Sequence, residues 1–267
     1  MDDIPAGNRA EGNLTDHTTC GNWMPQGVIF WFLPAAALLF AVGILLTVPV
    51  WSAVFFIASA LSFAFFLYLE YAFYLLSKDH SRLQREFHHL VIEKLAWDGK
   101  GKALDIGTGN GVLAVALAKK SPSSTVTGID LWGKPWSYTR ETCLANAALE
   151  GTADRVQFTR AGAENIPFPD GHFDVVVSNF TFHAVKTKRR LSLIREALRI
   201  VKKGGRFSFQ DLYNPEFYDD PDNLEEALKS WGAEDVHFVK SSSVINIPLP
   251  LRINHIAGNS GVLYGTK

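Results

Sequence analysis

A glycine-rich loop that begins with a carboxylate is the first place in the sequence where chemistry is expected. It reads Asp105-Ile106-Gly107-Thr108-Gly109-Asn110-Gly111 and lies between a short apolar run and an amphipathic segment. Glycines let the backbone approach a ligand closely while a tight turn leads into a helix. A dinucleotide-binding loop would need glycine at position 112, where Val112 stands. Because Asp105 is next to the loop, its carboxylate favours a cationic ligand over a pyrophosphate.

Two side chains further along the chain are candidates for moving a proton. His183 follows Asn179 by four residues, and its ordinary pKa of about 6.5 suits proton removal at neutral pH. The alternative role for His183 is to cap or pack the following helix. Asp211, which ends a predicted strand, is the second candidate; alternatively its carboxylate accepts hydrogen bonds from turn N–H groups. His88-His89 and Glu93 have i,i+4 spacing but no evident third ligand, so no metal site is expected.

Short apolar runs that alternate with amphipathic stretches must position these residues. The runs predict seven strands: Ala103–Ile106, Thr125–Ile129, Val156–Thr159, Phe173–Ser178, Arg206–Gln210, Val236–Lys240 and Gly261–Gly265. The stretches predict five helices: Asp79–Trp97, Gly111–Lys120, Trp136–Glu150, Leu191–Lys202 and Asp222–Trp231. This alternation predicts an α/β fold with a mostly parallel, doubly wound sheet. Ligands of such sheets bind beyond the carboxyl ends of the strands.

Composition excludes several other classes of protein. The 267 residues carry 26 basic and 27 acidic side chains, a formal charge of −1, which argues against a dedicated nucleic-acid binder. Two cysteines are too few for a disulfide framework or a structural zinc site. The near-neutral charge thus leads us to expect no nucleic-acid partner.

Charged residues are missing from one long stretch of the chain. Between Asp16 and Glu70 there are 53 residues without Asp, Glu, Lys or Arg. Within it, residues 28–48 and 52–69 are each close to the roughly 20 apolar residues that a membrane-spanning helix needs. Pro49 interrupts helix continuity between them, so a transmembrane helical hairpin is predicted. The alternative, two helices buried in a soluble core, is disfavoured because a 191-residue remainder could not enclose them.

The hairpin divides the chain into three predicted parts. These are a polar N-terminal tail at 1–27, the hairpin at 28–76 and a catalytic domain at 77–267. Lys78, Arg82 and Arg85 follow the second span closely, so the positive-inside tendency predicts a cytoplasmic domain. The tail lacks the basic start of a cleavable signal peptide, and an uncleaved multi-pass membrane anchor is expected.

From about Ser81 to Lys267 the sequence resembles the class I S-adenosylmethionine-dependent methyltransferases. The resemblance rests on the glycine loop, on Thr127-Gly128-Ile129-Asp130-Leu131 and on three later blocks in the family's order: Ala163–Phe168, Phe173–Asn179 and Leu198–Gly205. It implies a Rossmann-like, seven-stranded sheet of order 3-2-1-4-5-7-6. It also implies S-adenosyl-L-methionine as the cofactor.

Position by position, the resemblance assigns one group of residues to the methionine part of the cofactor. Asp105, with the backbone of Gly107 and Gly109 and the intervening Thr108, should hold this part. Asn179, at the end of the fourth predicted strand, should lie beside the methionine and the transferred methyl group.

A second group is assigned to the adenosine part. Asp130 should bind both ribose hydroxyls, Leu131 should pack on the adenine, and Ala163 should offer its backbone N–H to that ring. The family often has Asp at the place of Gly162, where it bonds the adenine amino group. Glu164 or a backbone carbonyl is the expected replacement.

These features predict a membrane-anchored methyltransferase acting on a small, lipophilic acceptor, with the bilayer as a partner. Quinone precursors, sterol-like molecules, lipid headgroups and hydrophobic thiols all stay open as acceptors. Ile247–Leu251, an apolar and proline-rich segment, either shapes a lipophilic entrance or packs in the core. The alternative function is a catalytically silent membrane scaffold or sensor that binds the cofactor, and Val112 disfavours a nicotinamide oxidoreductase.

Overall fold

The computed structural model describes residues 18, 20–24, 26–77, 82–133, 136–187, 190–218 and 223–267. Most of the predicted N-terminal tail, Lys78 and the predicted helix starts at Asp79 and Asp222 lie outside these ranges.

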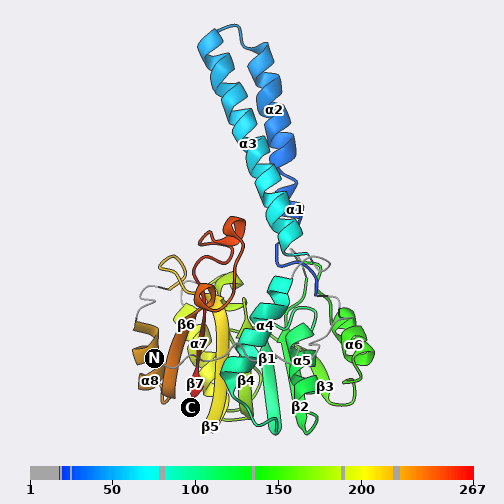
Figure 1. Ribbon diagram of the computed structural model, residues 1–267, viewed down its shortest axis with the longest axis vertical. Coiled ribbons are helices and arrows are strands. Elements are labelled where there is room, and N and C mark those ends of the chain that lie inside the picture. The colour runs from blue at the N-terminus through cyan, green and yellow to red at the C-terminus, as the bar shows by residue number, and fades with distance from the viewer. Residues whose placement is uncertain are drawn as a thin grey trace, which may run out of the picture.

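A seven-stranded sheet forms the centre of the domain (Figure 1), and it confirms the predicted fold. Its strands are β1 (Gly101–Ile106), β2 (Ser124–Asp130), β3 (Val156–Arg160), β4 (Phe173–Asn179), β5 (Val201–Leu212), β6 (Glu234–Lys240) and β7 (Ser260–Thr266). Their order is β3-β2-β1-β4-β5-β7-β6. The pairs among β1 to β5 are parallel, whereas β7 runs antiparallel to both β5 and β6.

Helices cover both faces of this sheet, as a doubly wound fold requires. On one face, α4 (Arg82–Leu95), α5 (Val112–Lys120) and α6 (Arg140–Leu149) bury Val91, Leu117 and Ala147 against the strands. On the other face lie α7 (Arg190–Arg199) and α8 (Leu224–Ser230). The carboxyl ends of the parallel strands therefore open at one edge, next to the loops that carry the candidate residues.

Within the described residues of the domain, two helix boundaries differ from the sequence prediction by three or more residues. The predicted helix Leu191–Lys202 ends at Arg199, because Val201 already pairs with Phe173 as the first residue of β5. The predicted helix Trp136–Glu150 begins only at Arg140, where the Thr139 hydroxyl accepts a hydrogen bond from the Thr142 N–H at 3.0 Å and caps the helix.

The apolar segment forms a helical hairpin that projects from the domain (Figure 1). It consists of α1 (Gln26–Ile29), α2 (Phe32–Leu45) and α3 (Pro49–Leu75). The first predicted span is divided at a turn because Pro34 has no N–H to donate to the Phe30 carbonyl, which instead accepts from Leu33 at 3.3 Å. Serine hydroxyls on α3 donate to α2 carbonyls, Ser59 to Ala36 at 2.8 Å and Ser62 to Phe32 at 3.1 Å.

Residues Gln26–Leu45 and Pro49–Leu75 are long and apolar enough to cross a membrane. Only 17% and 6% of the residues in their most apolar windows are buried against the protein. These helices are therefore possible membrane spans whose large apolar side chains the domain does not cover.

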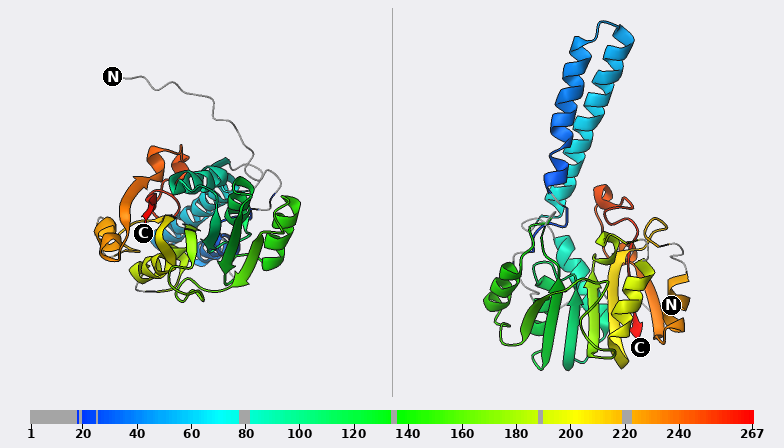
Figure 2. Two further views of the ribbon diagram at one scale, coloured as in Figure 1. Left: turned by 90° about the horizontal axis from the view of Figure 1, so that it is seen from below. Right: turned by 180° about the vertical axis from the view of Figure 1, so that it is seen from behind.

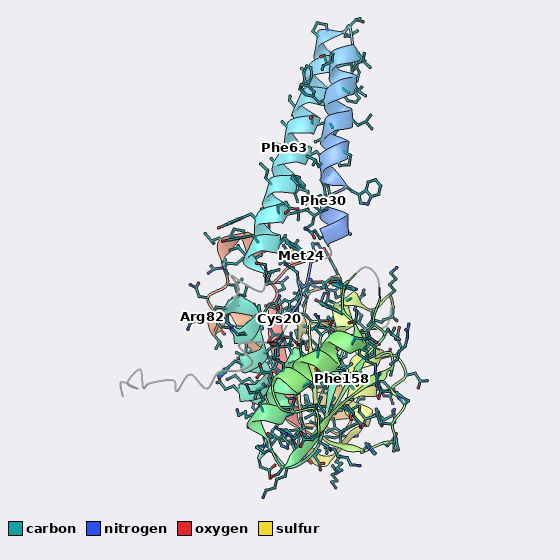
Figure 3. The ribbon with its side chains drawn as sticks, turned by 90° about the vertical axis from the view of Figure 1, so that its right-hand side faces the viewer. Cys20, Met24, Phe30, Phe63, Arg82 and Phe158 are labelled. Atoms are coloured by element: carbon teal, nitrogen blue, oxygen red, sulfur yellow. The ribbon has the colours of Figure 1, made fainter. Side chains whose placement is uncertain are left out.

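Hydrogen bonds tie the base of the hairpin to the domain. The Asn22 amide donates to the Phe73 carbonyl at 2.8 Å, and the Gln84 amide donates to the Leu76 carbonyl at 2.8 Å. The Tyr68 hydroxyl donates to the Pro250 carbonyl. Viewed from behind (Figure 2) and from the side (Figure 3), the hairpin stands on the same edge of the domain as the strand ends.

Candidate active site

A cavity of about 730 Å³ opens at the carboxyl ends of β1, β2 and β4. Its volume is typical of a site for a small molecule or cofactor, about 300–1,000 Å³. Every predicted cofactor residue lines it: Asp105, Gly107, Thr108, Gly109, Asp130, Leu131, Gly162, Ala163, Glu164 and Asn179. His183 lines it as well, whereas Asp211 does not.

The glycine loop follows β1 directly and requires glycine at its first position. Gly107 has φ of +71°, and its N–H donates to the Ile129 carbonyl at 2.8 Å. A Cβ atom at this position would collide with the side chain of Thr181. Glycine is therefore required here both by the positive φ and by the close packing of Thr181 against the loop.

Asp105 is buried beneath the loop. Its Oδ2 accepts a hydrogen bond from the Thr108 hydroxyl at 2.6 Å. The pKa of Asp105 is raised to about 7, chiefly by burial; the Thr108 hydrogen bond opposes this shift, and the nearby Asp130 carboxylate adds to it. A cationic group placed beside Asp105 would stabilise the ionised carboxylate.

Asp130 ends β2 at the edge of the cavity. Its Oδ2 accepts from the Gly109 N–H at 2.9 Å, and its Oδ1 accepts from the Trp132 N–H at 2.8 Å. Two backbone donors thus fix the orientation of the carboxylate, and each oxygen keeps acceptor capacity. This geometry is suited to receiving a pair of neighbouring hydroxyl groups.

The adenine end of the predicted site contains an exposed apolar side chain. Leu131 is 53% exposed, so a flat ring packed on it would bury apolar area. At Gly162, a Cβ atom would lie 2.9 Å from Glu164 Oε2. The Glu164 carboxylate therefore lies next to Gly162, where the family often carries Asp, and its role in place of that Asp stays a prediction.

Asn179 supplies an independent indication that a ligand fits here. Its Oδ1 is buried and has no hydrogen-bond partner among the described residues. A buried acceptor without a partner costs about 1–3 kcal/mol. A donor group of a ligand, such as the amino group of a methionine moiety, would remove this cost, so the residues present fit S-adenosylmethionine.

Backbone strain follows directly after Asn179. Phe180 has φ of +52°, a conformation that non-glycine residues rarely adopt. Its ring lies 6.2 Å from that of His183 and 4.9 Å from that of Trp23, measured between centroids. Strain of this kind clusters at functional sites, where surrounding contacts maintain it.

His183 and Asp211 form a hydrogen-bonded pair. His183 Nδ1 lies 2.6 Å from Asp211 Oδ1, and the His183 N–H donates to Oδ2 at 3.1 Å. Asp211 is fully buried and also accepts from the Leu212 N–H at 2.7 Å. Asp211 thus orients the imidazole and does not face the cavity, so its geometry fits a positioning residue rather than a base that touches the acceptor.

Part of the cavity wall was not anticipated from the sequence. Cys20, Trp23 and Met24 line it from before the hairpin, Phe87 and His88 from α4, and Ile256 from the loop before β7. The Trp136 indole N–H donates to the Trp23 carbonyl at 3.0 Å, and the Tyr138 hydroxyl donates to the Asn22 carbonyl at 2.8 Å. The density of aromatic residues after Asp130 was the one sequence signal for this wall.

His88 is a titratable group in that wall. It is almost completely buried, and burial lowers its pKa to about 4. Its ring lies 6.1 Å from that of Trp23. The imidazole is therefore neutral at physiological pH.

Residues 104–209 match the methyltransferase domain family. Among curated proteins, the ubiquinone/menaquinone biosynthesis C-methyltransferase UbiE of Geotalea daltonii is 29% identical over 136 residues, which are 51% of this chain and 55% of that protein. The UbiE of Pseudomonas fluorescens is 35% identical over 134 residues, half of each chain. The chain thus spans about half the length of the curated relatives it matches.

Solved structures show the same fold at low sequence identity. An O-methyltransferase family protein from Burkholderia thailandensis aligns with a TM-score of 0.53 at 18% identity, covering 70% of this chain and 56% of that one. The [4+2]-cyclase SpnF aligns with a TM-score of 0.50 at 21% identity, covering 67% of this chain and 79% of that one. Because a cyclase shares the fold, the fold alone does not establish the reaction.

Proposed function

Because residues 104–209 match the methyltransferase domain family, we propose that this protein transfers a methyl group from S-adenosylmethionine to a lipophilic, quinone-type acceptor at a membrane. The family, the fold and the residues that line the cavity support the cofactor. The acceptor class and the membrane location extend beyond what the family, the fold and the lining residues support.

One observation carries the proposal: both chain segments that flank the apolar hairpin line the cavity. Met24 precedes α1 by two residues and Leu76 directly follows α3, and both belong to the cavity wall. Figure 3 shows Met24 at the foot of the hairpin, with Cys20 below it. If the hairpin spans a bilayer, the cavity lies immediately beneath the membrane surface, where a lipophilic acceptor is concentrated.

Aromatic residues in the wall suit a flat acceptor ring. Trp23, Phe87 and Phe180 pack against one another with centroid distances of 4.9–5.6 Å. Such side chains favour stacked or edge-to-face contact with a quinol-type ring. The names of the UbiE relatives point to the same chemical class.

Within this proposal, each cofactor residue has a binding task. S-adenosylmethionine supplies an electrophilic methyl group on a sulfonium centre. Asp105 and the glycine loop hold the methionine part, with Asn179 Oδ1 accepting from its amino group. Asp130 accepts from the two ribose hydroxyls, and Leu131 packs on the adenine, with Ala163 and Glu164 at its polar edge.

We assign the proton transfer to His183. With Nδ1–H donating to Asp211, Nε2 is left to accept a proton from the acceptor hydroxyl. Removing that proton makes the acceptor more nucleophilic as the methyl group is transferred. The aromatic wall excludes water, which strengthens the electrostatic interaction between the reacting groups.

Location follows from the same reasoning. The hairpin anchors the protein in a membrane, and Arg82 and Arg85 near its base favour a cytoplasmic domain. No nucleic acid has a role in this proposal.

A two-stage experiment tests the proposal. S-adenosylmethionine is first titrated into the full chain in detergent by calorimetry, and turnover is then assayed with quinols that carry tails of different length. Binding with methylation of a tailed quinol supports the proposal. Binding without turnover on quinols, thiols, sterols or lipid headgroups would favour the silent scaffold instead.

A further inference from the structure

The length of α3 sets the level of the membrane surface. Its 27 residues extend about 40 Å at 1.5 Å per residue, whereas the hydrocarbon core is about 30 Å thick. If Pro49 lies at the far boundary, about 20 residues bring the near boundary to the neighbourhood of Tyr68. Glu70 is the first charged residue after that point, and Tyr71 and Tyr74 follow in the interfacial zone that tyrosine favours.

The loop 244–257, between β6 and β7, reaches this level. The Tyr68 hydroxyl donates to the Pro250 carbonyl, so the tip of the loop touches α3 at the level of the near boundary of the hydrocarbon core. Figure 1 shows the orange-red loop rising beside the lower end of the hairpin, and the rear view in Figure 2 agrees. The loop is therefore placed where a bilayer surface would meet the domain.

Side chains of the loop alternate between the core and the outside. Ile247 and Leu251 are fully buried and hold the loop on the domain together with α4. Leu249, between them, is 76% exposed, and Ile253 is 42% exposed. The ends of Ile247–Leu251 therefore pack in the core, which is one of its two expected roles, whereas its middle faces outward.

An exposed cation accompanies the outward-facing apolar residues. The Arg252 guanidinium donates from Nε to the Ile247 carbonyl at 2.7 Å, which holds it against the same loop that carries Leu249 and Ile253. Apolar side chains flanked by a cation match the boundary between acyl chains and anionic headgroups.

We propose that the loop 244–257 docks on the bilayer, with Leu249 and Ile253 in the acyl boundary and Arg252 among the lipid phosphates. The C-terminal end of the same loop, His255, Ile256 and Ala257, lines the cavity. The cavity therefore opens at the membrane surface, and an amphiphilic acceptor enters from the lipid along the loop. This inference rests on the proposed function, because it takes the hairpin to span the membrane.

Depth-dependent quenching tests the docking without measuring activity. In a full chain with Cys20→Ser and Cys143→Ala, a bimane label is placed at Leu249→Cys, at Leu38→Cys in the middle of α2, or at Leu149→Cys at the end of α6. All three positions are well exposed. The protein is reconstituted in vesicles that contain anionic lipid and lipids with a doxyl group at carbon 5 or carbon 12.

We expect Leu249→Cys to be quenched at least twofold more by the shallow quencher than Leu149→Cys, and Leu38→Cys to be quenched by the deep one. Quenching at Leu38→Cys without quenching at Leu249→Cys would overturn the docking inference and leave the membrane anchor intact. Absence of quenching at both would overturn the anchor and the inference together.

A second variant tests the entrance. Leu249→Asp should raise the KM for a long-tailed quinol several-fold while the KM for a short-tailed, water-soluble quinol stays the same; Leu149→Asp should change neither. Equal effects on both quinols would contradict an entrance at the membrane surface.

Discussion

The two halves of the cavity are built in different ways. The proposed cofactor half consists of Asp105, the glycine loop, Asp130 and Asn179, which lie at the carboxyl ends of the neighbouring parallel strands β1, β2 and β4. The proposed acceptor half is assembled from segments that are more than 200 residues apart, including Trp23 and Ile256. Local sequence determines the first half, whereas tertiary packing determines the second. This explains why the family match at 104–209 includes the cofactor half but leaves out most of the acceptor half.

The largest expected effect separates chemistry from binding. His183→Ala should lower kcat by about 10²–10⁴-fold, because a positioned base contributes that much, and leave the cofactor Kd unchanged. Steady-state kinetics with a tailed quinol and calorimetry measure the two quantities. His237→Ala, an exposed histidine on β6, is the matched control. Normal rates for His183→Ala at every pH would leave this residue only a packing role.

A change in the cofactor half should act on cofactor affinity. Asp130→Ala removes charged hydrogen bonds of about 1.5–3 kcal/mol, so the Kd should rise about 10- to 150-fold. Asp154→Ala, an exposed carboxylate, controls for the loss of charge. Unchanged affinity in Asp130→Ala would disprove the ribose assignment.

Asp105 gives the same half a pH signature. With its pKa at about 7, cofactor binding that prefers the ionised form should weaken by up to tenfold per pH unit below 7. The stability of the ligand-free chain should have the opposite pH dependence. Folding raises the pKa of Asp105 above the usual 3.8, so the free energy of unfolding should fall as pH rises from about 4 to 7. Asp105→Asn should abolish both slopes in calorimetry and thermal melting. Slopes that persist in this variant would belong to another group.

The smallest effect should belong to the acceptor half alone. Trp23→Ala removes aromatic contacts of about 0.5–1.5 kcal/mol, so the acceptor KM should rise about 2- to 10-fold with little change in cofactor Kd. Trp23→Phe should restore most of the affinity. If Kd and KM rose equally, the division into two halves would be wrong.

Most of the fold could be predicted because its signals are local. All seven predicted strands are present, with ends that differ by one or two residues except at β5, which begins at Val201 instead of Arg206. The early start of β5 depends on pairing with Phe173, which periodicity does not reveal. The length of the uncharged stretch was enough to predict the hairpin. The break between α1 and α2 near Phe30 depends on a local cause, the missing N–H of Pro34.

The site was predictable only in part, for a related reason. Asp105, Asp130 and Asn179 occur at strand ends, and parallel topology brings strand ends together. Trp23 lies in a segment expected to be a polar tail, and nothing in its neighbours indicated contact with Phe180, 157 residues later. The burial of Asp211 beneath His183 likewise depends on how β5 and η1 (Phe182–Ala184) pack.

Trp23 and Met24 precede the hairpin, whereas the sheet follows it. A recombinant fragment that starts at α4 to improve solubility would therefore lack part of the cavity wall as well as the apolar hairpin. Such a fragment should still bind the cofactor, but it would lack Trp23, so the ring of a bound acceptor would be exposed to water on that side. Assays of acceptor methylation accordingly call for the full chain from the outset.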